Sequence, residues 1–361
     1  AQKDMVCSKV LASPQRQDAL KALDKELNSL QNNILTEVKA TDKDFDYAVR
    51  NATPGRLLLD IKRNGTYKVR GVKQGFREDK ASEDGPDFNY YSNVVKLSTV
   101  RTALCRKRTR TSIIAIKDVS TAFLQAHKYA NGKYKFICFK HPVTGFWHYY
   151  RQSGPIYGEA SAPVRWELTI APWLVEQGFT RGENDACVFY HEEKDLLVLL
   201  YVDDCMADGE PEEVEWIFDL LAERFQCKDT EYVTIDTPQD YLGTDLIMTE
   251  DHMYRSMQRY IENAASILNI TGKCHDTPIA APIDEEAQTL TPFEKKEFLT
   301  GLGMLGWLAQ TVRCDIAYVY SRIGQHTATP NQSAIQAVRR AFSYLLGTKD
   351  YCIRAPMYGS A

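Results

Sequence analysis

The amino-acid sequence predicts an α+β fold in which strands and hairpins precede a helical region. Two observations support this prediction. Strand-like apolar runs separated by turn signals recur through the first two thirds of the 361 residues, and stripes with helical spacing fill most of the last third. The hydrophobic content of 44% and the charged content of 25% are typical of a globular protein that can build a sizeable core.

A helix and a hairpin are predicted to open the chain. A leucine stripe predicts an amphipathic helix over residues 16–32. Two strand-like runs over residues 57–72 flank Asn64-Gly65, the strongest short hairpin signal. The basic residues of this hairpin are Lys62, Arg63, Lys68 and Arg70. These cations could bind a polyphosphate or a nucleic-acid backbone. They could equally protect an exposed edge strand from pairing with another chain, and taken alone they favour this second interpretation.

Two apolar strands lead into acidic residues. Residues 196–202 are too few to span a membrane and run into Asp203 and Asp204, and residues 113–116 run into Asp118. If these strands lie side by side, three carboxylates meet at one edge of a sheet. Carboxylates that close repel each other unless a cation lies between them. The pattern therefore specifies a divalent-metal site.

The alternative is that these acids are ordinary turn formers at strand ends, which a lone Asp-Asp pair favours. The second strand with its acid, the aromatic Phe123 after it and the basic hairpin upstream favour the metal site instead. Oxygen ligands suit Mg²⁺. Two such ions roughly 3.5–4 Å apart supply what phosphoryl transfer needs.

The remaining elements follow the same rules of periodicity. Helices are predicted over residues 94–106, 164–177 and 211–225, the second ended by Gly178. Strands are predicted in a hairpin over residues 134–150, at 187–190 as the partner of the 196–202 run, at Thr234-Ile235 and at 241–248, with a turn at Asp208-Gly209. From Gln258 onward four helical stripes are expected, the third N-capped by Asp315.

Composition excludes several classes of protein. The formal net charge of −4 means that nucleic-acid binding would need a local basic surface, of which residues 101–110 are the densest candidate. The nine cysteines form no C-x-x-C pair and no zinc pattern with histidine. The sequence has no signal peptide and no apolar run of about 18 residues, so we expect a soluble, intracellular protein that does not enter a membrane.

Several motifs occur in an order and spacing that are highly specific. Tyr201-Val202-Asp203-Asp204 is a Y-x-D-D box, and residues 118–124 precede it. With their neighbours they resemble the reverse transcriptases of copia-type long-terminal-repeat retrotransposons over residues 18–350. The other matching segments are residues 26–30, 68–76, 157–166, 225–229, 241–243, 313–317 and 344–349.

The resemblance implies a right-hand polymerase with fingers, an antiparallel palm sheet, a thumb and a helical C-terminal region. No ribonuclease H domain is expected within these residues. The implied parts are the N-terminal helix and fingers at 1–110, the palm at 111–133, further fingers at 134–165, further palm at 166–250, and the thumb with following helices at 251–361.

The resemblance also implies roles for the acids and their neighbours. Asp118 and Asp203, helped by the Val119 carbonyl, would hold two Mg²⁺ ions, for which Mn²⁺ can substitute. Asp204 would lie closer to the primer end. Lys228 would donate a proton to the departing pyrophosphate.

Nucleotide and primer contacts are implied in the same way. Phe123 would be the steric gate that rejects a 2′-hydroxyl. Arg70 and one of Lys62 or Arg63 would hold the triphosphate, and Tyr201 and Gly243 would support the primer.

One departure from the family affects the nucleotide site. Ser161 replaces a glutamine that normally helps place the incoming nucleotide, Glu159-Ala160 replaces Leu-Lys, and Arg165 stands one position late. Either Ser161 fills that place with a shorter side chain, or Gln152 or another donor substitutes.

The function implied is an RNA- and DNA-templated DNA polymerase whose partners are a template–primer duplex and dNTPs. An RNA polymerase is disfavoured because an aromatic at position 123 leaves no room for a 2′-hydroxyl. The alternative is a catalytically inactive, domesticated polymerase fold that only binds nucleic acid. A homo-oligomer is left open.

Overall fold

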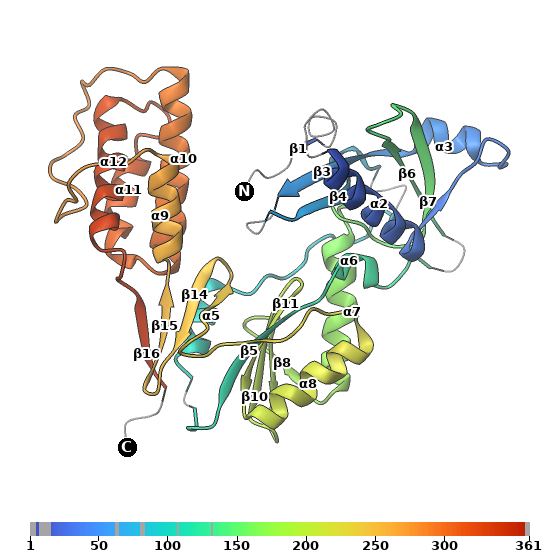
Figure 1. Ribbon diagram of the computed structural model, residues 1–361, viewed down its shortest axis with the longest axis horizontal. Helices are drawn as coiled ribbons and strands as arrows, with labels where there is room; N and C mark the ends of the chain where they lie inside the picture. The colour runs from blue at the N-terminus through green and yellow to red at the C-terminus, as the bar shows by residue number, and fades with distance from the viewer. Residues whose placement is uncertain are drawn as a thin grey trace. The chain divides into compact units, whose positions relative to one another are not determined.

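The described part of the chain folds into three sheets and a set of helices, which confirms the predicted α+β class (Figure 1). The computed structural model describes residues 5–6, 16–61, 65–79, 84–106, 108–130 and 133–357. These residues form two compact units. The first comprises residues 1–95, 117–205 and 216–229, and the second comprises residues 96–116, 206–215 and 230–361.

The first unit contains a six-stranded sheet with the order β1-β3-β6-β7-β2 and β4 paired to β3. Its strands are β1 (Met5–Val6), β2 (Leu35–Glu37), β3 (Thr53–Ile61), β4 (Tyr67–Lys73), β6 (Lys135–Lys140) and β7 (Trp147–Gln152). The antiparallel pairs β3–β4 and β6–β7 confirm both predicted hairpins. The tip of the first, including Lys62 and Arg63, lies outside the described residues.

Helix α2 (Arg16–Asn33) packs against this sheet and confirms the predicted N-terminal helix. Leu23 and Leu30 are fully buried in the shared core. A Cβ added to Gly71 of β4 would meet the end of the Leu30 side chain at 2.6 Å, so a larger residue there would make that side chain shift. Helix α3 (Phe45–Asn51) and the short η1 (Gly75–Arg77) flank the strands.

A second sheet has the strand order β12-β5-β11-β10-β9-β8. Its strands are β5 (Ile113–Asp118), β8 (Thr180–Arg181), β9 (Val188–His191), β10 (Leu196–Tyr201), β11 (Asp204–Gly209) and β12 (Glu231–Tyr232). The pairing of β9 with β10 confirms the third hairpin. Strand β5, which ends at Asp118, lies beside β11, which begins at Asp204, as the sequence predicted.

Helices α5 (Leu97–Leu104), α7 (Ala162–Glu176) and α8 (Pro211–Arg224) occupy the predicted positions within a few residues, and the short α6 (Ala122–Gln125) follows β5. Gly178, with a φ of +96°, follows the end of α7 as expected. The prediction of a turn at Asp208-Gly209 is wrong, because both residues lie in β11. The fully buried Asp208 carboxylate there accepts hydrogen bonds from Arg108 at 3.0 and 2.7 Å.

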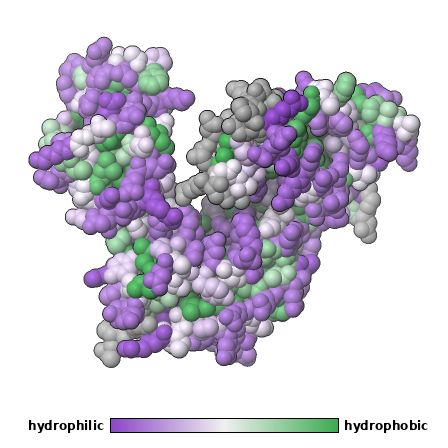
Figure 2. All heavy atoms as spheres, in the orientation of Figure 1, coloured by the Kyte–Doolittle hydropathy of each residue, from purple (hydrophilic) through white to green (hydrophobic). Residues whose placement is uncertain are grey.

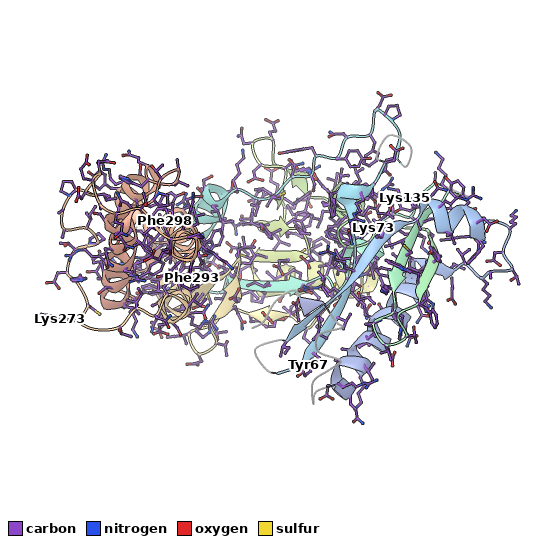
Figure 3. All side chains as sticks on the ribbon, turned by 90° about the horizontal axis from the view of Figure 1, so that it is seen from above. Tyr67, Lys73, Lys135, Lys273, Phe293 and Phe298 are labelled. Carbon is purple, nitrogen blue, oxygen red and sulfur yellow. The ribbon has the colours of Figure 1, made fainter. Side chains whose placement is uncertain are left out.

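The second unit combines a four-stranded sheet with a helical bundle. The strands are β13 (Gln239–Tyr241), β14 (Thr244–Met248), β15 (His252–Ser256) and β16 (Ile353–Pro356). The helices are α9 (Gln258–Ile267), α10 (Pro292–Thr311), η2 (Cys314–Ile316), α11 (Ala317–Gly324) and α12 (Gln332–Gly347). On α10, Phe298 is fully buried and Phe293 is 77% exposed, and Figure 3 labels both. The predicted helical region is confirmed.

Three local predictions in this unit are wrong. Residues 241–248 form two strands, because Leu242 and Gly243 adopt positive φ values and turn the chain back. Thr234-Ile235 lies outside any strand, between β12 and β13. Asp315 does not cap α11, because its carboxylate accepts hydrogen bonds from Arg313 and Tyr344 instead.

On the face drawn in Figure 2, hydrophilic residues predominate and hydrophobic residues lie scattered among them. Among the residues that the structure describes, no helix combines the length and the apolar character needed to cross a membrane.

Candidate active site

The site begins at the tight turn between β10 and β11. Val202 adopts a φ of +55°, which is strained for a β-branched residue. Two hydrogen bonds hold this turn: the Trp166 indole donates to the Val202 carbonyl at 2.5 Å, and the Val119 N–H donates to the Asp203 carbonyl at 2.8 Å. The second bond ties the turn directly to the chain that follows Asp118.

The residues after Asp118 are held from the other side by the segment 226–228. The Ser120 N–H donates to the Gln226 carbonyl at 2.8 Å, and the Lys228 N–H donates to the Asp118 carbonyl at 2.9 Å. This pairing brings the Lys228 ammonium to 2.6 Å from the Asp118 carboxylate. Thr121, with a φ of +51°, then turns the chain into α6.

Asp118 and Asp203 line one cavity of about 490 Å³ in the first unit. The pKa of Asp203 is raised, first by burial and then by the charge of Asp118. Arg70, Tyr157 and Lys228 line the same cavity. Two strands and two loops therefore place a pair of repelling carboxylates between basic side chains.

The donor set fits a hard divalent cation. Asp118 and Asp203 offer carboxylate oxygens, and a cation between them would relieve the repulsion that raises the pKa of Asp203. Asp204 begins β11 and is not among the residues that line the cavity. No group of three or more His, Cys, Asp or Glu side chains within the described ranges is arranged to hold a metal ion. The predicted third carboxylate thus stays a prediction.

Among the predicted nucleotide contacts, Arg70 lines this cavity, and Phe123 contacts Tyr157, which also lines it. The Arg70 guanidinium pairs with the Asp60 carboxylate at 3.0 Å, and the Arg70 side chain is 43% exposed. The Phe123 ring meets the Tyr157 ring edge-on, with centroids 5.3 Å apart. Burial, and then the Asp203 charge, raise the pKa of Tyr157 to about 12, so the phenol stays protonated at neutral pH. Sequence reasoning assigned no role to Tyr157.

Comparison with known proteins identifies the family. The family model described as reverse transcriptase (RNA-dependent DNA polymerase) matches residues 56–283. The chain belongs to this reverse transcriptase family. The match and the retrotransposon relatives confirm the predicted copia-type, RNA-directed DNA polymerase domain.

Three relatives illustrate the likeness of this reverse transcriptase to known proteins. The Pol polyprotein from transposon TNT 1-94 of Nicotiana tabacum is 25% identical over 95% of this chain and 26% of its own length. The Pol polyprotein from transposon RE1 of Arabidopsis thaliana is 28% identical over 80% of this chain and 19% of its own length. The putative transposon Ty5-1 protein of Saccharomyces cerevisiae is 26% identical over 66% of this chain and 77% of its own length. The chain thus spans about a quarter or less of the two Pol polyproteins.

A solved structure of telomerase from Candida albicans aligns with 92% of this chain and 71% of its own. The sequence identity is 11% and the TM-score is 0.41, which is too low to establish a common fold.

In this reverse transcriptase, Ser161 and Gln152 do not line the Asp118–Asp203 cavity. Both are fully buried, and both donate to the Glu159 carboxylate, at 2.7 and 2.5 Å. The interpretation of Gln152 as a substitute donor to the nucleotide is therefore wrong, because its amide nitrogen lies among buried acceptors, 2.7 Å from the Tyr129 hydroxyl and 2.8 Å from the Gly154 carbonyl.

The two predicted primer contacts lie in different units. Tyr201 ends β10 in the first unit and is half-buried. Gly243 occupies the β13–β14 turn of the second unit with a φ of +74°. Tyr201 ends its strand as predicted, whereas Gly243 lies in a turn within residues 241–248, where the apolar pattern predicted a continuous strand. The roles of both residues stay predictions.

Proposed function

We propose that this reverse transcriptase extends a base-paired primer with dNTPs, copying RNA or DNA templates. The observation that carries this proposal is the pair Asp118 and Asp203, delivered by separate strands to one cavity with Arg70 and Lys228 on its wall. Phosphoryl transfer needs positioned charges more than covalent help from the protein. This cavity offers positioned charges of both signs.

Asp118 and Asp203 hold the metal ions in this proposal, with the Val119 carbonyl beside them and Asp204 nearer the primer end. Two bound Mg²⁺ ions, or Mn²⁺ in their place, supply neutralisation of the phosphate charge and a more nucleophilic 3′-oxygen. An Asp118 carboxylate that held a metal ion would give up its ion pair with the Lys228 ammonium, which would then be available to the substrate.

The remaining residues bind and orient the substrates. Arg70, with one of Lys62 or Arg63, holds the triphosphate through charge-assisted hydrogen bonds. The freed Lys228 ammonium donates a proton to the departing pyrophosphate. Phe123 lies under the sugar and excludes a 2′-hydroxyl.

The proposed architecture is a right hand. We assign residues 1–110 and 134–165 to the fingers, 111–133 and 166–250 to the palm, and 251–361 to the thumb and following helices. Tyr201 and Gly243 support the primer strand in this arrangement.

Primer extension by the parent and an Asp203→Asn variant tests the proposal. The variant keeps the size of the side chain but loses the metal-binding charge, so extension should fall by at least about 10³-fold while duplex binding stays within about twofold. Asp236→Asn, an exposed aspartate that does not line the cavity, is the matched control. A parent that binds duplex but incorporates no dNTP with Mg²⁺ or Mn²⁺ would instead identify a non-catalytic binding module.

A further inference from the structure

The loop between β7 and α7 carries a fully buried carboxylate, Glu159. Five groups donate hydrogen bonds to its two oxygens. They are the Tyr129 hydroxyl at 2.8 Å, the Lys135 ammonium at 2.9 Å, the Gln152 amide at 2.5 Å, the Ser161 hydroxyl at 2.7 Å and the Ile156 N–H at 3.3 Å. A buried charge this well satisfied makes any displacement of the loop costly.

Burial alone would raise the pKa of Glu159, but the charges of Lys135 and Lys73 lower it below its ordinary value. Figure 3 labels these two lysines, which come from β6 and β4. The carboxylate therefore stays ionised at neutral pH, and the loop is held by charge as well as by shape.

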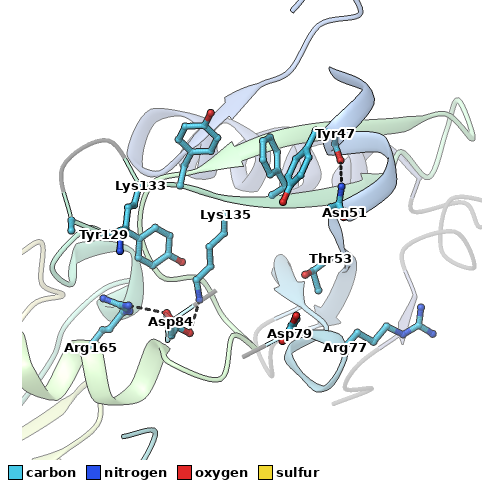
Figure 4. A pocket seen from close by; sticks show the side chains of 13 residues that line it. Tyr47, Asn51, Thr53, Arg77, Asp79, Asp84, Tyr129, Lys133, Lys135 and Arg165 are labelled. Carbon is cyan, nitrogen blue, oxygen red and sulfur yellow. Dashed lines mark hydrogen bonds and ion pairs between the residues drawn. The ribbon is translucent and has the colours of Figure 1, made fainter. Parts of the chain in front are cut away.

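Glu159 belongs to a closed ring of ion pairs and hydrogen bonds. Lys135 joins Glu159 to Asp84, with its ammonium 2.8 Å from the Asp84 carboxylate. Asp84 pairs with Arg165 at 2.9 Å, and both bonds are drawn in Figure 4. The Arg165 Nε donates to the Ser161 hydroxyl at 3.1 Å, and that hydroxyl donates to Glu159, which closes the ring.

The same loop is also hydrogen-bonded to the end of β4 and to the residues that follow it. The N–H groups of Lys73 and Gly75 donate to the carbonyls of Tyr157 and Gly158, at 2.7 and 3.1 Å. The Ala160 N–H donates to the Glu78 carboxylate at 3.0 Å. A Cβ on Gly158, whose φ is +78°, would lie 2.3 Å from the Lys73 carbonyl oxygen, so this approach requires glycine.

Two residues before Glu159, the loop presents Tyr157 to the catalytic cavity. Tyr157 lines that cavity with Asp118 and Asp203, and its ring contacts Phe123. The loop thus has one end in the ring of charges and the other in the wall of the nucleotide site. A shift of the loop moves Tyr157 and, with it, the support of Phe123.

We propose that the ring formed by Glu159, Lys135, Asp84, Arg165 and Ser161 is a positioning device that holds Tyr157 against Phe123 and so sets the affinity for the incoming dNTP. Glu159 is its central positioning residue. Ser161 in this chain serves the ring, since its short hydroxyl reaches both Arg165 and Glu159. The inference rests on the proposed polymerase function of the same cavity.

Steady-state primer extension by Glu159→Gln tests the proposal. Glutamine keeps the shape of the side chain but removes the negative charge to which the Lys135 ammonium and the Ser161 hydroxyl donate hydrogen bonds. We expect KM for dNTP to rise about tenfold while kcat stays within about twofold, because the chemical groups remain and only the placement of the nucleotide suffers. Glu176→Gln, an exposed glutamate on α7, is the matched control and should keep both parent values.

Ser161→Ala is the second variant, because it opens the ring without removing any charge. It should raise KM about threefold in a variant that still folds, with a melting temperature lowered by the lost buried hydrogen bonds, and it tests the proposal if Glu159→Gln does not fold. Parent KM values in the folded variants would overturn the positioning role and leave the proposed function standing. A kcat loss at parent KM would also overturn it, since a merely structural residue lowers the active fraction. A parent enzyme without extension activity would overturn the proposed function instead.

Discussion

The Lys228 ammonium lies 2.6 Å from the Asp118 carboxylate, and both side chains line the same cavity. The lysine is 56% exposed, so the pair contributes little to folding. In the proposed mechanism, the ammonium that neutralises Asp118 here would be available to the pyrophosphate leaving group when Asp118 holds a metal ion.

Lys228→Ala should therefore lower kcat without unfolding the protein. Loss of a general acid is expected to lower kcat roughly 10²-fold. The Mg²⁺ concentration for half-maximal rate should fall, because no ammonium competes for Asp118. Extension rates over a Mg²⁺ titration measure both effects. Lys39→Ala, at an exposed site outside the cavity, is the control. A parent-like kcat would remove Lys228 from the chemistry.

The tight turn between β10 and β11 gives a second prediction, through the hydrogen bond from the Trp166 indole to the Val202 carbonyl. Trp166→Phe keeps an aromatic ring but leaves that carbonyl without its indole donor. A lost buried hydrogen bond costs about 1–3 kcal/mol, and release of the strained turn displaces Asp203. We expect kcat to fall roughly tenfold, which rapid-quench primer extension would measure.

Trp216→Phe is the matched control, because Trp216 of α8 packs on Phe179 and His191, away from the turn. If both variants lose the same activity and the same stability, the Trp166 bond has no special part in holding Asp203.

Local patterns predicted the framework of this site well. The strands that lead into Asp118 and Asp203 are short apolar runs, and their burial favours their pairing in one sheet. The apolar pattern was therefore sufficient to predict that these two residues lie close together. The turn at Gly243 was missed although the glycine was visible, because a continuous strand fits the apolar pattern of residues 241–248 equally well. At Asp208 the local pattern favoured a turn, but Arg108, 100 residues away, stabilises the buried carboxylate in a strand.

The surroundings of Ser161 could not be predicted, because, as at Asp208, the groups that stabilise a buried carboxylate come from distant parts of the chain. Its partner Glu159 is near in sequence, but the cations that make a buried glutamate acceptable lie on β6 and β4. Alone, the substitution of glutamine by Ser161 indicated a weaker nucleotide contact. Only the tertiary fold shows that its hydroxyl bonds to Glu159 and Arg165.

The raised pKa of Asp203 predicts a pH-dependent gain in stability for Asp203→Asn in metal-free buffer. Burial first, and then the Asp118 charge, raise the folded-state pKa above its ordinary value of 3.8. The ionised carboxylate is therefore unfavourable in the fold above that raised pKa, and asparagine removes this cost. Well below 3.8 the parent is protonated in both states, and the difference vanishes.

Thermal unfolding in EDTA from acidic to neutral pH measures this effect. The variant should melt about 1–2 °C above the parent at neutral pH, with the gap closing as pH falls. Mg²⁺ should then raise the melting temperature of the parent but not that of the variant. A gap that widens toward acidic pH would show that Asp203 is stabilised in its charged form.

The contact of Phe123 with Tyr157 gives the last prediction, on sugar selection. Phe123→Val shortens the side chain and opens space where a 2′-hydroxyl would meet the ring. The preference for dNTP over rNTP should fall by roughly 10²-fold, mainly through a lower KM for rNTP. Competition between labelled dNTP and rNTP during primer extension measures this ratio. Phe146→Val, at a 72% exposed phenylalanine between β6 and β7, should leave the ratio unchanged. Equal discrimination in Phe123→Val and the parent would mean that another group meets the sugar.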